Sequence, residues 1–119
     1  MNKKITIKDF QKLDIRVGTV THAEVPEWSH WVMKLEVDLG KEIGKLNVFA
    51  GIMKFFKPQE LVGKQLPFLV NLEPKKIGPE GDMSQAMLLA ANLPAEKEED
   101  EKPILFEPTK KVPNGVKVH

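Results

Sequence analysis

The sequence contains no cysteine among its 119 residues, which excludes disulfide bonds, thiolate chemistry and zinc sites built on pairs of cysteines. It also lacks long hydrophobic runs, because no window approaches the roughly 18 to 20 apolar residues that a transmembrane helix needs. No apolar stretch follows the lysines near the N-terminus, so we expect no signal peptide. The length predicts a single domain over residues 1–119, and a cytoplasmic location is the simplest interpretation.

Arginine is almost absent, because Arg16 is the single arginine among 18 basic residues. The formal net charge is only +1, so the field of the whole protein would steer nucleic acid weakly. Acidic residues gather in the segment 96–102, whereas lysines outnumber acids elsewhere. Lysine is a hydrated point charge that suits phosphates better than the edges of bases. Any nucleic-acid binding should therefore depend on shape, stacking and phosphate contacts.

Motifs for catalysis and metal binding are missing from the sequence. The histidines at positions 22, 30 and 119 have no metal-ligand spacing, and we expect them to lie on the surface. Glu36 and Asp38 share the outward face of a predicted strand, without a histidine base nearby, and we expect them to be surface charges or partners of lysines. No Walker loop, nucleophile elbow or zinc motif occurs. We therefore expect a non-enzymatic protein without a metal ion or other cofactor.

Alternating apolar residues predict several short β-strands. The clearest run covers residues 31–39, where every second residue is expected to point into a core, Trp31 included. Gly18 predicts a bulge or bend in the first strand, and Pro67 predicts an edge or a bulge in the fourth. The other expected strands lie near residues 15–25, 45–52, 66–72, 104–106 and 116–118.

The second half of the chain contains less regular segments. Residues 73–83 are polar and rich in glycine and proline, so we expect a flexible loop there. The apolar run 87–91 predicts a buried strand, and the acidic segment 96–102 predicts a solvated loop. Residues 113–115 read Pro-Asn-Gly, which predicts a turn.

Two short helical elements complete the expected fold. Thr6 and Asp9 form a capping box that opens a helix within residues 1–13, whose apolar face is expected to cover one open end of a barrel. Pro58 and Gly63 bound a helical turn between the third and fourth strands. This order of elements predicts an all-β, five-stranded OB-fold barrel with a short N-terminal helix and a helical turn between strands 3 and 4. A β-sandwich of the same size would give a similar periodicity.

Four segments carry a resemblance to a known family. The segments 9–18, 56–64, 71–91 and 112–115 read DFQKLDIRVG, FKPQELVGK, NLEPKKI followed by SQAMLLAA, and VPNG. In this order they resemble the signature of the tRNA-binding domain family. The resemblance spans nearly the whole chain.

The resemblance implies an OB-fold and recognition of tRNA by its shape, without catalysis. Relatives include C-terminal domains and detached small subunits of methionyl-tRNA synthetases, free-standing tRNA-binding proteins, and CsaA export chaperones. For free-standing members it implies a homodimer, and we expect the C-terminal extension, residues 93–119, to contact the second copy. The implied partners are tRNA, a second copy of the chain, and either a methionyl-tRNA synthetase or unfolded polypeptides.

The clearest candidate RNA-binding residues lie in one segment. Lys75 and Lys76 match the tRNA-contacting loop of the family, and Asn71 and Ser84 flank it. We expect the lysines to contact phosphates. A solvated loop with ordinary surface lysines is the alternative.

Other candidates are distributed along the first three strands. Trp28 lies in the loop between strands one and two, one of the two loops that OB-folds use, and it either stacks on a base or covers an apolar or subunit surface. Phe49 faces away from the apolar side of its strand and is either a platform for a ligand or a dimer contact. Lys34, Lys45 and Lys54 are weaker candidates for phosphate contacts.

Three functions remain open at this point. The first is shape-selective tRNA binding, as a free-standing protein or a detached methionyl-tRNA synthetase subunit. The second is a CsaA-like chaperone that binds unfolded polypeptides through an apolar groove in the dimer, formed by Trp28, Phe49 and neighbouring apolar groups. The third is a dimerisation or docking module that recruits an enzyme.

Overall fold

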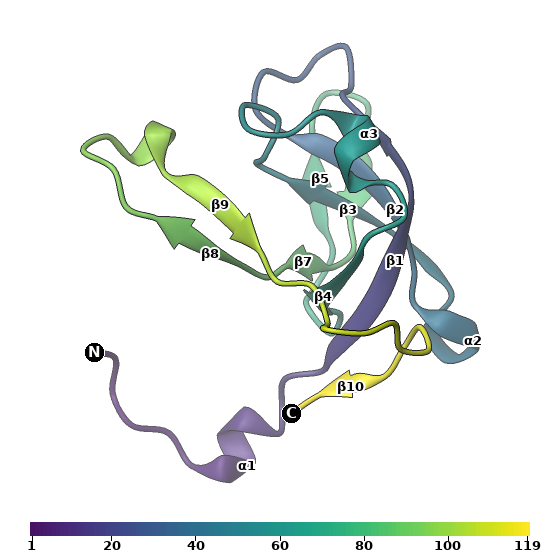
Figure 1. Ribbon diagram of the computed structural model, residues 1–119, viewed down its shortest axis with the longest axis vertical. Helices are drawn as coiled ribbons and strands as arrows, with labels where there is room; N and C mark the ends of the chain where they lie inside the picture. The colour runs from purple at the N-terminus through teal and green to yellow at the C-terminus, as the bar shows by residue number, and fades with distance from the viewer.

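A computed structural model describes all residues from 1 to 119 and contains a nearly closed antiparallel β-barrel (Figure 1). Its strands follow the spatial order β3-β2-β1-β4-β7. A short C-terminal strand, β10 (Lys117–Val118), pairs with the beginning of β1. The all-β, OB-like barrel predicted from the sequence is therefore confirmed. The barrel strands are β1 (Ile15–Glu24), β2 (Met33–Asp38), β3 (Lys45–Ala50), β4 (Gln65–Leu69) and β7 (Met87–Leu88).

The barrel closes through the residues that precede β7. Gln85 exchanges two hydrogen bonds with Asn47 of β3: the N–H of Gln85 donates to the Asn47 carbonyl (2.8 Å), and the N–H of Asn47 donates to Oε1 of Gln85 (2.9 Å). Next to them, the N–H of Phe49 donates to Oγ of Ser84 (3.1 Å). These contacts join the free edge of β3 to the last part of the barrel.

Two hairpins leave the barrel. Strands β5 (Lys75–Ile77) and β6 (Asp82–Ser84) form the first, so the prediction of a flexible loop over 73–83 was wrong. Strands β8 (Ala90–Leu93) and β9 (Lys102–Leu105) form the second, which projects from the barrel as an arm and carries the short helix η1 (Glu98–Asp100) at its tip (Figure 1). The expected buried strand over 87–91 is divided between β7 and this arm, and Met87 is 51% exposed.

Three short α-helices were only partly predicted. The capping box between Thr6 and Asp9 is present at α1 (Ile7–Phe10), but no residue of this helix is buried and it lies away from the barrel (Figure 1). The expectation that it covers a barrel end was therefore wrong for a single chain. Helix α3 (Pro58–Leu61) begins with Pro58 as predicted, and α2 (Gly40–Ile43) occupies a turn between β2 and β3. No helix is both long and apolar enough to cross a bilayer.

The core follows the predicted alternation along β2. Met33, Leu35 and Val37 are completely buried, whereas the residues between them are partly exposed. Phe68 of β4 is the largest side chain that is completely buried. Trp31 departs from the pattern because it precedes the strand and is 60% exposed, so its assignment to the core was wrong. Alternation buries a side chain only where the sheet is covered by another layer.

Strand β1 bends at a different place from the one predicted. Its register against β2 shifts between Val20 and His22, which places the irregularity at Thr21 rather than at Gly18. Gly18 serves close packing instead, since a Cβ there would lie 2.6 Å from Cγ1 of Val37 and 3.0 Å from the Asp38 carbonyl oxygen.

The segment from Val112 to Val116 crosses back over its own barrel. Gln65 of β4 accepts from the Val112 N–H (3.0 Å) and donates to the Val112 carbonyl (2.7 Å) and to Oδ1 of Asn114 (3.0 Å). The hydroxyl of Thr19 also donates to Oδ1 of Asn114 (2.7 Å). We call residues 112–116 the strap. The strap and β10 contact the chain's own barrel, whereas the arm projects away from it (Figure 1).

Candidate nucleic-acid interface

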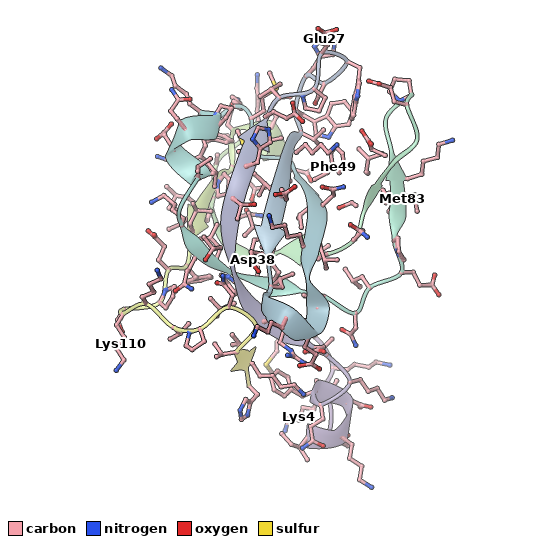
Figure 2. All side chains as sticks on the ribbon, turned by 90° about the vertical axis from the view of Figure 1, so that its right-hand side faces the viewer. Lys4, Glu27, Asp38, Phe49, Met83 and Lys110 are labelled. Atoms are coloured by element: carbon pink, nitrogen blue, oxygen red, sulfur yellow. The ribbon has the colours of Figure 1, made fainter.

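A groove separates strand β3 from the β5–β6 hairpin. The hairpin stands beside the barrel, with Met83 on the hairpin and Phe49 on the side of β3 that faces it (Figure 2). The space between them measures about 550 Å³. Phe49, Lys75 and Ser84 line it, so three of the predicted site residues meet in one groove. The other lining residues are mainly apolar: Leu72, Glu73, Ile77, Ala86 and Met87.

Lys75 and Lys76 are exposed on β5. Lys75 pairs with Ser84 across the hairpin and faces the groove, whereas Lys76 pairs with Met83. Successive residues of a strand point to opposite faces, so the two ammonium groups flank the hairpin. Neither forms an ion pair with a carboxylate of the chain. Both charges are thus available to an external anion.

Trp28, Phe49 and Lys34 gather at one end of the groove. The rings of Trp28 and Phe49 are tilted by 31° with centroids 6.3 Å apart. The Lys34 ammonium lies 5.9 Å from the Phe49 ring centroid and 3.7 Å from Oδ1 of Asp82 on β6. Lys34 therefore already has a carboxylate and an aromatic partner within the chain, which weakens it as a phosphate ligand.

Asn71 and Ser84 have structural partners. Oδ1 of Asn71 accepts from the Asp14 N–H (2.9 Å), and its Nδ2 donates to the Lys12 carbonyl (2.6 Å), which ties the N-terminal segment to the end of β4. Oγ of Ser84 accepts from the Phe49 N–H and donates to the Ala86 carbonyl (3.3 Å). Both side chains position the segments around the groove.

Lys45 and Lys54 lie outside the groove lining. Lys45 pairs with Glu36 on the neighbouring strand at 3.6 Å. Lys54 forms an ion pair with Asp100 of the acidic segment and donates to the Glu99 carbonyl (3.1 Å). Glu36 is close to Lys45 in the sequence, whereas the partner of Lys54 comes from a distant position in the chain and was not predicted.

Most of the apolar residues that line the groove were not predicted from the sequence. The apolar run 87–91 predicts that Met87 is buried, but Met87 is half exposed and lines the groove. Leu72 is exposed there as well, although it continues the apolar alternation of β4. The sequence feature that could have indicated this role is their position on either side of the lysine-bearing segment 73–83.

Arg16 belongs to the scaffold and not to the site. Its side chain is buried, and Nε donates to Oδ1 of Asp14 (2.6 Å) while Nη1 donates to Glu42 (3.2 Å) and to the Gly115 carbonyl (3.0 Å). The hydrogen bonds to Asp14 and then to Glu42 raise the pKa of the Arg16 guanidinium above its ordinary value. The only arginine therefore holds the strap against β1 and α2. No group of three or more His, Asp or Glu residues is arranged to hold a metal ion.

The barrel and its lysine-bearing hairpin place the protein in the class of OB-like binding domains. The profile of the family described as "Putative tRNA binding domain" matches residues 15–117. The chain belongs to this family. The resemblance seen in the four sequence segments is confirmed.

Individual relatives agree with this assignment. A methionine–tRNA ligase from Methanothrix thermoacetophila is 42% identical over 111 residues, which cover 93% of this chain but 15% of the ligase. The chain thus spans about one seventh of the length of such ligases. A solved MetRS-related protein from Pyrococcus horikoshii has a TM-score of 0.83 and 34% identity, covering 99% of this chain and 100% of its own. The chaperone CsaA from Bacillus anthracis has a TM-score of 0.81 and 32% identity, covering 98% of this chain and 100% of its own.

Proposed function

We propose that this protein binds tRNA by its shape and its phosphates, as a free-standing protein or as a detached subunit of a methionyl-tRNA synthetase. The observation that carries the proposal is the pair Lys75 and Lys76, exposed and free of carboxylate partners on a hairpin beside the groove. Membership of the tRNA-binding domain family supports it. The protein would act as a binding module without catalysis of its own, in the cytoplasm.

The candidate lysines differ in whether they already have a carboxylate partner, and this difference ranks their expected contributions to RNA affinity. Lys75 and Lys76 would release counterions when they meet phosphates, so affinity should fall with salt. Lys34, Lys45 and Lys54 each have a carboxylate partner, and binding would have to break or share that ion pair. Phe49 would supply an apolar wall for the ligand, while Asn71 and Ser84 would act indirectly by holding the surrounding segments.

A homodimer forms part of the same proposal. The arm and the residue that follows it present apolar side chains to solvent, including Leu93, Ile104 and Phe106, each more than two-fifths exposed. Exposed apolar residues gathered on a projecting element are typical of a surface that a second chain covers. Light scattering should give twice the mass of one chain, and a persistent monomer would refute this part.

A second candidate function is the binding of unfolded polypeptides. The groove wall is mainly apolar, with Leu72, Ile77 and Met87 beside Phe49, and such a wall would accept apolar side chains of an extended peptide. The similarity to a solved CsaA chaperone supports this candidate. Peptide binding of this kind should depend little on salt, which separates it from tRNA binding.

The deciding experiment is a competition for the protein between bulk tRNA, a random RNA duplex and an unfolded polypeptide. Fluorescence anisotropy of a labelled tRNA measures how much of it stays bound. The proposal expects tRNA to bind most tightly. In the double variant Lys75→Ala/Lys76→Ala, the salt slope of log K should fall by about two, one for each lost phosphate contact. Affinity for tRNA equal to that for the duplex, or displacement of tRNA only by the polypeptide, would refute the proposal.

A matched control removes the same charge elsewhere. Lys41 and Lys110 are also exposed without ion pairs, and Lys110 lies on the far side of the barrel from the hairpin (Figure 2). The variant Lys41→Ala/Lys110→Ala should keep the wild-type salt slope. An equal loss in both double variants would indicate attraction by the overall charge and not contact at the hairpin.

A further inference from the structure

The β5–β6 hairpin needs support from outside itself. It contains only three residue pairs, from Lys75–Ser84 to Ile77–Asp82. A two-stranded hairpin of this size is at best marginally stable in water. Yet the hairpin carries Lys75 and Lys76, the two lysines of the proposed site that have no carboxylate partner. These lysines are held in place only while the hairpin is ordered.

The base of the hairpin is fixed to the barrel. Ser84 and Gln85 form the hydrogen bonds to β3 that close the barrel. These bonds hold the end at which the chain returns to the barrel. The turn at the opposite end contains Gly78 and Gly81, both with positive φ (75° and 80°), and needs a separate anchor.

The side chain of Trp28 contacts the turn of the β5–β6 hairpin. Its indole lies so close to the backbone of Gly78 that a Cβ at this position would come within 2.6 Å of both Cε2 and Cη2. The same ring meets Phe49 on β3, so it lies between the hairpin turn and the barrel. The ion pair between Lys34 and Asp82 joins the same two parts at 3.7 Å.

We propose that Trp28 is a positioning residue that latches the tip of the lysine-bearing hairpin to the barrel, and that it does not stack on RNA. This inference rests on the proposed function, because it explains how the RNA-binding lysines are held. Of the two roles that the sequence left open for Trp28, the structure favours the covering role, since its ring packs against Gly78 and Phe49. The more exposed indole nearby is that of Trp31.

The latch would affect RNA affinity by setting the fraction of molecules in which the hairpin is ordered. If the hairpin opens, only the latched fraction presents Lys75 and Lys76 together beside the groove, and the apparent affinity falls by that fraction. The barrel core would be untouched, because Trp28 is not among its buried residues. The latch also sets the position of one groove wall, to which Ile77 belongs.

Hydrogen exchange of the protein without RNA tests the latch directly. In Trp28→Ala, the amides of residues 75–83 should exchange about tenfold faster or more, while those of β1 and β2 keep their wild-type rates. Trp31→Ala is the matched control, because it removes an exposed indole three residues away and should leave hairpin exchange unchanged. Trp28→Phe keeps an aromatic ring and should restore most of the protection. Unchanged exchange in Trp28→Ala, or equal effects in both alanine variants, would overturn the proposal.

Fluorescence separates positioning from stacking. In the Trp31→Phe background, Trp28 is the single tryptophan, and its emission should change little when tRNA binds. Strong quenching on binding would show that a base stacks on Trp28 and would overturn the inference. If Lys75→Ala/Lys76→Ala binds tRNA like the wild type, the proposed site fails, and hydrogen exchange still decides whether the latch exists.

Discussion

Replacement of Gln65 by leucine tests how the strap is held. Gln65 is 8% exposed, and its side chain makes three hydrogen bonds, two with the backbone of Val112 and one with Asn114. Leucine has a similar size but no polar atoms, so Gln65→Leu leaves the N–H and C=O of Val112 without their partner. Each lost bond costs about 1 kcal/mol, and the greater apolar burial of leucine offsets part of this.

We therefore expect the free energy of unfolding to fall by about 2 to 3 kcal/mol, which corresponds to roughly 10 °C in Tm for a domain of this length. Urea unfolding followed by circular dichroism measures the change, and hydrogen exchange should show the largest loss of protection over residues 112–118. The control is Gln59→Leu on α3, where the side chain is exposed and forms no hydrogen bond in the chain. A wild-type midpoint for Gln65→Leu would refute the reasoning, because it would mean that the strap contributes nothing to the stability of the barrel.

Three further substitutions examine the scaffold and the surface. Gly115→Ala should destabilise the protein by about 2 to 4 kcal/mol in thermal unfolding, because φ is +94° and the new Cβ would lie 2.5 Å from the Leu39 carbonyl oxygen. Trp31→Ala should change the unfolding free energy by about 0.5 kcal/mol or less, since the indole is exposed; a loss of several kcal/mol would contradict the structure. Arg16→Lys keeps the charge but loses the planar fork that binds Asp14, and should cost about 1 to 2 kcal/mol in chemical unfolding. Because the folded state raises the pKa of Arg16, its contribution is complete at neutral pH and is lost only when strongly alkaline pH deprotonates it, so this cost should not vary across the neutral range.

The sequence by itself determined the first four barrel strands, the starts of α1 and α3, and the family. Alternation along Met33–Val37, the capping box at Thr6 and Pro58 at the start of α3 are local patterns, and local geometry is enough to produce their effects. The four signature segments identified the barrel because they depend on residue order and not on contacts.

Only the tertiary structure decided which side chains of the site are free. Lys75 and Lys54 are both lysines in polar surroundings, but Lys54 meets Asp100, 46 positions further along the chain, whereas Lys75 meets no carboxylate. Trp28 packs against Gly78 while Trp31 remains exposed, although the two tryptophans lie three positions apart in the same loop. Exposure and pairing depend on what distant segments place over a residue, and periodicity within one strand carries no information about those segments.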